Sequence, residues 1–405
     1  MSKEIRHITV IGAGNMGHQI AISAAIAGFQ VICTDQNPDA LQRASDFADT
    51  YLAGRISKGR MSEQEVTNTK AGLRFERSLA VAVQQADLII EAIIEKLEVK
   101  RALFSELDTL CPPHTILATN SSYIVSSQIA SVTKRPDKVV NMHFFNPALV
   151  MNLVEIVKGP HVSSETVELL EAVSNKMGKT PVVLQKEIYG FVVNRMLQAT
   201  RKEALNLLDL GVASVEDIDQ AVTKGLGYPM GPFQLLDLTG IDLAYHVGME
   251  KYQASGDEAD KPSPTIVEKF EKGEWGKKVG KGFYDYDEKR NRIPDPEVEK
   301  IILDVAEKMQ VRRRKIEADE ILERLLLPMV NEGARILVGK HAKDNIHLSR
   351  ASARCLKELR NCFRRIGVVP AVQPDLCSLR QTRDQGAGRE QLKPGRPMSP
   401  LHRCA

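Results

Sequence analysis

The stretch HITVIGAGNMGHQIAISAAIAG, residues 7–28, decides the fold because it joins a β-branched strand pattern to a helical pattern through three glycines. In such a strand-turn-helix unit, Gly12 allows the tight turn, Gly14 lets a phosphate approach the backbone, and Gly17 lets the helix pack closely on the strand. A pyrophosphate then lies at the positive end of the helix, where free N–H groups bind it. The stretch therefore predicts a dinucleotide-binding turn; the alternative is a glycine-rich turn without a ligand.

An acidic residue closes the second predicted strand. Asp35 ends the run FQVICTD, residues 29–35. A carboxylate at this position can accept hydrogen bonds from both ribose hydroxyls and repel a 2′-phosphate, which favours NAD over NADP as the cofactor. The alternative is that Asp35 is only a turn residue before Asn37 and Pro38.

Strand and helix patterns alternate from residue 7 to about residue 185, which is typical of βαβ units around a parallel sheet. We therefore predict an α/β fold with a Rossmann-type domain over residues 1–186. Between the second and third strands, residues 38–82 predict a long basic helical excursion with a turn near its middle. Four later strands are predicted at residues 86–93, 115–120, 138–145 and 153–159.

From residue 187 onward the pattern is helical. Apolar residues recur at helical spacing from 193 to 208, and Gly211 is placed to end that helix. Ser214 and Ser263 have the sequence context of N-caps for two further helices. Residues 187–288 therefore predict an all-α domain that follows the α/β domain.

The opening of this helical domain recurs later in the chain. Arg195 and Glu203 lie eight residues apart, and Arg324 and Glu332 repeat that spacing within a similar apolar pattern. We therefore predict that residues 289–340 are a partial second copy of the helical domain, which is not completed.

The composition is that of a soluble chain with two domains and an extension. Its 405 residues are 43% hydrophobic and 26% charged, which supplies a sizeable core. No run of about 18 apolar residues is present, and the first residues do not have the pattern of a signal peptide. We therefore expect a cytoplasmic protein that does not bind membranes. No two cysteines have metal-site or redox spacing, so no metal is expected.

Residues 341–405 differ from the rest of the chain. They hold 13 Lys and Arg against 5 Asp and Glu, and four of the six cysteines. Because the whole chain has a net charge of +3, the first 340 residues carry −5, which gives no support to nucleic-acid binding. One hypothesis for this atypical basic tail is a shifted reading frame or a degenerate extension, and the other is a partner-binding arm. We predict disorder for at least about its last 30 residues.

The stretch HFFNPALVMNLVEIV, residues 143–157, places one histidine and one glutamate in two strand-like runs. His143 suits proton transfer near neutral pH, and Glu155 can orient the imidazole and stabilise its charged form. A strand, a turn and a second strand would bring the two side chains together, and a buried Glu155 needs such a partner. The alternative is that His143 is a packed core residue.

Six motifs in this order, GAGNMG, EAIIEKLEVK, ATNSS, HFFNP, GFVVNR and GKGFYDY, resemble those of NAD-dependent L-3-hydroxyacyl-CoA dehydrogenases, including bacterial 3-hydroxybutyryl-CoA dehydrogenases. The resemblance covers about residues 5–288. It implies reversible oxidation of the 3-hydroxyl of an (S)-3-hydroxyacyl-CoA with NAD, and a homodimer formed through the helical domain. His143 would be the general base and Glu155 its orienting partner.

The resemblance also implies roles for residues outside this pair. Ser122 and Asn194 match residues that hydrogen-bond the substrate near its reacting oxygen or thioester carbonyl. Because CoA is rich in phosphate, the basic side chains of the excursion are expected to bind it; they are Arg55, Lys58 and Arg60. The matched cofactor contacts are Glu95, Lys100, Asn120, Asn146 and, more loosely, Lys278.

Each of these residues also has a structural alternative. Ser122 could cap the next helix, Glu95 and Lys100 could be solvated helix charges, and Asn194 could be a helix-surface amide. The basic excursion could be a solvated helical hairpin. For the whole chain, the alternatives are a related dehydrogenase of hydroxy acids or carnitine, and a non-catalytic NAD-binding protein such as a lens crystallin. The second would lack the histidine base, which is present here.

Overall fold

The computed structural model describes residues 4–289, 291–294, 300, 304, 305, 307 and 316–339. Contacts within the chain divide it into two units, Met1–Leu359 and Arg360–Ala405, and every described residue belongs to the first. The predictions for the tail, residues 341–405, lie outside the described residues, as does most of the segment 295–315.

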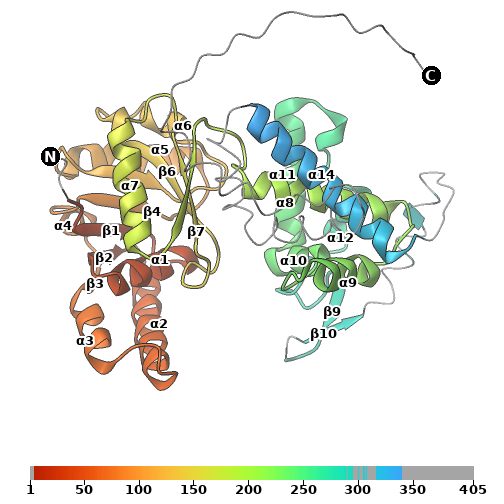
Figure 1. Ribbon diagram of the computed structural model, residues 1–405, viewed down its shortest axis with the longest axis horizontal. Coiled ribbons are helices and arrows are strands. Elements are labelled where there is room, and N and C mark those ends of the chain that lie inside the picture. Colours follow the sequence, from red (N-terminus) through yellow and green to blue (C-terminus); the bar gives the residue numbers. More distant parts are fainter. Residues whose placement is uncertain are drawn as a thin grey trace, which may run out of the picture. The chain divides into compact units, whose positions relative to one another are not determined.

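An eight-stranded sheet forms from the first part of the chain (Figure 1). Its strands lie in the order β3, β2, β1, β4, β5, β6, β7, β8, and all neighbours are parallel except β6 and β7. β2 and β4 lie on opposite sides of β1, so the connections that follow β1 and precede β4 run to opposite sides of the sheet. Such a topological switch point opens a crevice at the carboxyl ends of the strands. The strands are β1 His7–Ile11, β2 Gln30–Thr34, β3 Leu73–Glu76, β4 Leu88–Glu91, β5 Ile116–Thr119, β6 Val139–Phe144, β7 Leu153–Val157 and β8 Thr180–Leu184.

Helices cover both faces of this sheet. Apolar side chains of α1 (Asn15–Ile26) and α7 (Ser164–Lys176) share one buried core with the strands. Those of α5 (Leu97–Leu110) and α6 (Ser126–Ala130) form a second core. Because both faces are covered, all four residues of β4 are buried. The α/β fold expected from the alternating pattern is therefore confirmed.

Two details of the predicted sheet are wrong. The region 38–82 is not helical throughout: α2 (Pro38–Ser57) and α3 (Glu63–Ala71) are followed by the edge strand β3 and the short helix α4 (Leu79–Ala82). The strand escaped prediction because it has only four residues, none of them fully buried. The sheet is also not wholly parallel, since residues 145–152 join β6 to β7 without the crossover helix that a parallel pair needs.

Helices dominate from residue 193 onward, as the pattern predicts. Gly211 has φ +60° just after the first of them, and the hydroxyls of Ser214 and Ser263 accept backbone N–H groups as N-caps. The region is not wholly helical, because an antiparallel hairpin of β9 (Tyr284–Tyr286) and β10 (Arg292–Pro294) follows α12. The helices are α8 Val193–Asp209, α9 Val215–Leu226, α10 Pro232–Thr239, α11 Ile241–Ser255, α12 Pro264–Glu271 and α14 Ala318–Val338.

The last described helix, α14, packs along α8. Over the part of the chain that the structure describes, no helix combines the length and the apolar character that crossing a membrane requires.

Candidate active site

His143 and Glu155 face each other across two antiparallel strands. They are direct partners in the register of β6 and β7, and Nδ1 of His143 lies 2.8 Å from Oε2 of Glu155. Both side chains are buried. A carboxylate can only accept here, so Nδ1–H donates to it and Nε2 of the imidazole is left as a proton acceptor. The pair thus has the arrangement of a base and its orienting group.

The acceptor nitrogen of His143 faces a serine. Ser122, which follows β5, has its Oγ 3.0 Å from Nε2. The alternative that Ser122 caps the next helix is wrong, because Val125 is the N-cap residue of α6. The rings of Phe145 and Phe191 lie 4.6 and 5.5 Å from the imidazole, measured between ring centroids, and make its surroundings apolar.

The second oxygen of Glu155 binds the start of a helix. Its Oε1 accepts hydrogen bonds of 3.0 Å from the N–H groups of Val192 and Val193, where α8 begins. The carboxylate therefore lies at the positive end of the α8 dipole and binds its first free N–H groups. Sequence reasoning missed this contact. The available signal was a helix that begins at a valine, which cannot cap with its side chain and needs an acceptor from elsewhere.

The glycine turn has the shape that a dinucleotide needs. A Cβ at Gly12 would lie 2.6 Å from the carbonyl oxygen of Ala92, and one at Gly17 would lie 1.7 Å from that of Gly12. Gly14 has no atom within 4 Å of such a Cβ and precedes α1 without a side-chain cap. The backbone is thus closed on the protein side and open where a pyrophosphate would approach the helix. These residues fit NAD.

Asp35 binds the glycine turn itself. Its Oδ2 accepts from the N–H of Ala13 at 2.8 Å, and its Oδ1 accepts from the N–H of Asn37 at 2.8 Å. It therefore has a turn role, as the alternative required, and also connects the end of β2 to the cofactor turn. A carboxylate oxygen can accept further hydrogen bonds, so these contacts are compatible with ribose binding.

Lys100 is buried rather than solvated. Its Nζ lies 2.6 Å from Oε1 of Glu91 and 3.4 Å from Oε2 of Glu95. The alternative that Lys100 is a solvated helix charge is therefore wrong. Glu95 also accepts from the N–H of Tyr123 at 3.2 Å, which anchors the segment containing Ser122. Glu91 was missed from the sequence, although a charged residue inside the apolar run DLIIEAII was a visible signal.

Two asparagines arrange the neighbouring loops. The side-chain oxygen of Asn120 accepts from the N–H of Phe144 at 2.8 Å, next to the histidine. That of Asn146 accepts from Nδ2 of Asn15 at 3.1 Å, which lies within the glycine turn. Asn120 thus connects the end of β5 to β6, and Asn146 connects the loop after β6 to the start of α1.

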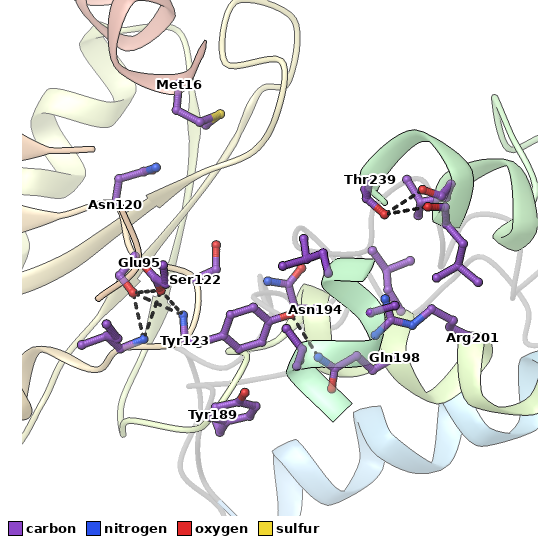
Figure 2. A pocket seen from close by; sticks show the side chains of 18 of the residues that line it. Met16, Glu95, Asn120, Ser122, Tyr123, Tyr189, Asn194, Gln198, Arg201 and Thr239 are labelled. Atoms are coloured by element: carbon purple, nitrogen blue, oxygen red, sulfur yellow. Dashed lines mark hydrogen bonds between the residues drawn. The ribbon is translucent and has the colours of Figure 1, made fainter. Parts of the chain in front are cut away.

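A cavity of about 860 Å³ is lined by residues of the sheet domain and of the helices (Figure 2). Asn120 and Ser122 line it from the loops after the strands, and Asn194 lines it from the first turn of α8. Asn194 is therefore not an outer-surface amide. The cavity extends along α8 past Gln198 as far as Arg201.

Of the predicted site residues, only Glu95, Lys100, Asn120, Ser122 and Asn194 line this cavity. The pair of His143 and Glu155 and the glycine turn adjoin it without being part of its lining, and the predicted CoA cations are not part of it either. Arg55, Lys58 and Arg60 lie at the turn between α2 and α3. Nζ of Lys278 pairs with Oδ2 of Asp242 at 2.5 Å. Among the described residues, no contact links Arg55, Lys58, Arg60 or Lys278 to the chain of Glu155, His143 and Ser122. For metals, the described ranges contain no group of three or more His, Cys, Asp or Glu side chains that could hold an ion.

Two family models match consecutive parts of the chain and together cover most of residues 7–286. The model for the "3-hydroxyacyl-CoA dehydrogenase, NAD binding domain" matches residues 7–188. The model for the "3-hydroxyacyl-CoA dehydrogenase, C-terminal domain" matches residues 190–286.

Individual relatives agree with these models. A probable 3-hydroxybutyryl-CoA dehydrogenase of Bacillus subtilis is 42% identical over 287 residues, which is 71% of this chain and 99% of the relative. The 3-hydroxyadipyl-CoA dehydrogenase of Escherichia coli is 36% identical over 359 residues, 87% of this chain and 74% of the relative. The crystal structure of an E. coli 3-hydroxybutyryl-CoA dehydrogenase is similar with a TM-score of 0.74 and 28% identity, covering 90% of this chain and 96% of that one.

Proposed function

The chain belongs to the 3-hydroxyacyl-CoA dehydrogenase family, and on that premise we propose how its residues interconvert an (S)-3-hydroxyacyl-CoA and the 3-oxoacyl-CoA. One observation carries the proposal: Glu155, His143 and Ser122 form a chain of contacts that ends at the cavity. Bound NAD⁺ supplies the acceptor for the hydride that leaves C3 of the substrate. Nε2 of His143 takes the proton of the 3-hydroxyl as that bond breaks.

The neighbouring groups support this proton transfer. Glu155 stabilises the imidazolium through Nδ1–H and is itself held by the start of α8, so the imidazole cannot rotate away. Ser122 and Asn194 would hydrogen-bond the reacting oxygen and the thioester carbonyl, and their position in the cavity lining supports this assignment. The rings of Phe145 and Phe191 exclude water, which strengthens these interactions.

The test is NADH-coupled turnover of 3-hydroxybutyryl-CoA by the wild type and by His143→Ala. General-base catalysis is worth about 10²- to 10⁴-fold, so kcat should fall within that range while NADH binding is retained. His114→Ala is the matched control, because His114 pairs with Asp87 just before β5, at the opposite end of that strand from Ser122. Turnover by His143→Ala at the rate of the control would contradict the proposal.

For the cofactor, we propose that pyrophosphate binds the N–H groups at Gly12, Gly14 and Gly17 and that Asp35 binds the ribose. The open side of the glycine turn supports the first assignment. Glu95, Lys100, Asn120 and Asn146 would shape the nicotinamide side, mainly by holding the loops described above. Lys278 has the weakest support, since it is paired with Asp242.

The basic residues at the α2–α3 turn remain a proposed CoA-phosphate site. Support comes from the chemistry of Arg55, Lys58 and Arg60, which suits phosphate and lies at the end of a helical hairpin. Nε of Arg55 has no partner among the described residues, so it is available to a ligand after local rearrangement.

Domain limits, oligomeric state and location are proposals as well. We propose a sheet domain over residues 1–186, a helical domain over 187–288 and a partial second copy over 289–340.

We also propose a homodimer, on family grounds, and a cytoplasmic location, where NAD and acyl-CoA are available. Because α14 packs on α8 within the chain, the partner would have to use other faces of the helical region. Light scattering at several concentrations tests the homodimer, and cell fractionation tests the cytoplasmic location.

A further inference from the structure

An arginine stands in the helical wall of the cavity. Asn194, Gln198 and Arg201 lie at positions i, i+4 and i+7 of α8, which places them on one face of the helix, and all three line the cavity (Figure 2). Nothing in the proposed mechanism uses Arg201. Its position extends the row of polar groups along the cavity, away from the start of α8 where Glu155 is bound.

The surroundings of this arginine are mostly apolar. Burial lowers the pKa of Arg201, and a guanidinium nevertheless stays charged near neutral pH. The helical wall of the cavity contains more apolar than polar side chains; its polar members besides Arg201 include Gln198, Tyr228, Thr239 and Glu250. Its apolar members include Leu197, Val222, Leu235, Leu236, Leu243 and Val247.

In the part of the chain that the structure describes, no carboxylate pairs with this charge, although Glu250 lines the same cavity. Among the described residues, Arg201 makes no hydrogen bond or ion pair, and its electrostatic neighbour is the phenol of Tyr123. Two other arginines of the helical region are each paired with a carboxylate, Arg195 with Glu332 and Arg324 with Glu203. The side chain of Arg201 is half-buried. A cation partly withdrawn from water without a partner is costly, and an anion brought by a ligand would offset that cost.

We propose that Arg201 binds a carboxylate at the far end of the acyl chain, so that the enzyme acts on dicarboxylic 3-hydroxyacyl-CoA substrates. The inference rests on the proposed function, which places the reacting carbon near Ser122 and Asn194. Seven residues of helix separate Asn194 from Arg201 by about 10 Å along the axis. Helical side chains lean toward the N-terminus, and the long arginine side chain therefore spans part of that distance. A few methylene groups between C3 of the substrate and its distal carboxylate would span the rest of the distance between Asn194 and the guanidinium of Arg201.

The CoA moiety also carries anions, and its phosphates are the other source of negative charge. The apolar wall around Arg201 favours the acyl chain, because hydrocarbon solvates methylene groups and not the phosphates of a nucleotide. Kinetics can distinguish the two, since all substrates share CoA and only some carry the distal carboxylate.

The experiment measures kcat/KM for 3-hydroxyadipyl-CoA, its neutral distal amide and 3-hydroxybutyryl-CoA. The wild type should prefer the carboxylate to the amide by about ten- to hundredfold, the value of a hydrogen-bonded charge. Arg201→Leu should reduce this preference to near one, and Arg201→Lys should restore part of it. Lys202→Leu is the matched control, because it removes a charge from the same helix outside the cavity.

Two results would overturn the inference. The first is a wild type that does not distinguish carboxylate from amide, a comparison that needs no variant to fold. The second is an equal loss on all three substrates in Arg201→Leu, which would assign Arg201 to CoA or to the fold. If the wild type turned over 3-hydroxybutyryl-CoA and lacked the preference, only this inference would fail. If His143→Ala matched the wild type, the proposed function would fail instead.

Discussion

Arg324 of α14 forms an ion pair with Glu203 of α8, with 2.6 Å between the guanidinium nitrogen and the carboxylate oxygen. The same two helices hold the reciprocal pair, in which Arg195 of α8 binds Glu332 of α14. Each arginine precedes its own helix's glutamate by eight residues, so the two helices must run antiparallel. The repeated Arg and Glu positions in the sequence thus form two reciprocal ion pairs between α8 and α14. These pairs support the proposal that α14 opens a second copy of the helical domain.

These exchanged pairs should contribute to stability. Arg324→Glu places two carboxylates together at Glu203 and should lower the free energy of unfolding by about 1–2 kcal/mol, a modest value because the side chains are partly exposed. The double variant Glu203→Arg with Arg324→Glu should recover most of the loss, measured by urea unfolding. A double variant no more stable than Arg324→Glu would show that the pair does not hold the helices together.

Removing the charge of Glu155 should impair both orientation and proton transfer. In Glu155→Gln the imidazolium loses its counter-ion, so kcat should fall by about 10²-fold or more with little change in KM. Glu165→Gln, at the exposed start of α7, is the control. The assay is NADH-coupled turnover, with a melting curve for each variant because Glu155 also binds α8. A normal kcat in a folded Glu155→Gln would contradict the orienting role.

The glycines of the cofactor turn should respond differently to alanine. Gly14→Ala adds a Cβ that meets no protein atom, so the melting temperature should hardly change while the Kd for NADH rises about tenfold or more. Gly17→Ala collides with the carbonyl of Gly12 and should lower the melting temperature markedly. Calorimetric titration with NADH and a thermal scan give both values. Unchanged NADH affinity in Gly14→Ala would mean that the pyrophosphate does not lie there.

The basic turn between α2 and α3 can be tested by substrate affinity. Lys58→Ala should raise KM for 3-hydroxyacyl-CoA with little effect on kcat, because it removes binding of the CoA phosphates and not a catalytic group. Lys70→Ala provides the control, since Lys70 in α3 pairs with Asp49. An unchanged KM in Lys58→Ala would remove the contact from the proposal.

Asp237 should make stability depend on pH. Burial raises its pKa from 3.8 to about 6, even though the N–H groups of Phe283 and Tyr284 and the hydroxyl of Tyr286 favour the charged form. The folded state therefore binds this proton more tightly than the unfolded state. The resulting stabilisation is complete below about pH 4 and is lost as pH rises through about 6, by up to about 3 kcal/mol.

The measurement is the free energy of unfolding of the wild type and of Asp237→Asn between pH 4 and pH 7. Other groups titrate in both proteins, so only the difference between the two curves counts. The stability of the wild type relative to the variant should fall as pH rises. Parallel curves would show that Asp237 does not titrate in this range.

Much of the sheet domain follows from local pattern. β1 and its glycine turn were readable because strand, turn and helix are adjacent in the sequence and each leaves its own periodicity. The edge strand β3 was not, because a half-buried strand of four residues carries little apolar signal. The hairpin of β9 and β10 was missed for another reason: Asp237, far away in α10, anchors its start through two backbone N–H groups.

The sequence by itself determined the cofactor turn, the spacing that lets His143 meet Glu155 across a strand connection, and the order of motifs that marks the family. Only the tertiary structure decided that Glu155 also holds the start of α8 and that Lys100 is buried against Glu91. It also decided that Arg201 stands in the cavity wall without a carboxylate partner among the described residues. The reason is physical. Periodicity and turn chemistry depend on neighbours in the chain, whereas pairing and burial of charges depend on which distant segments pack together.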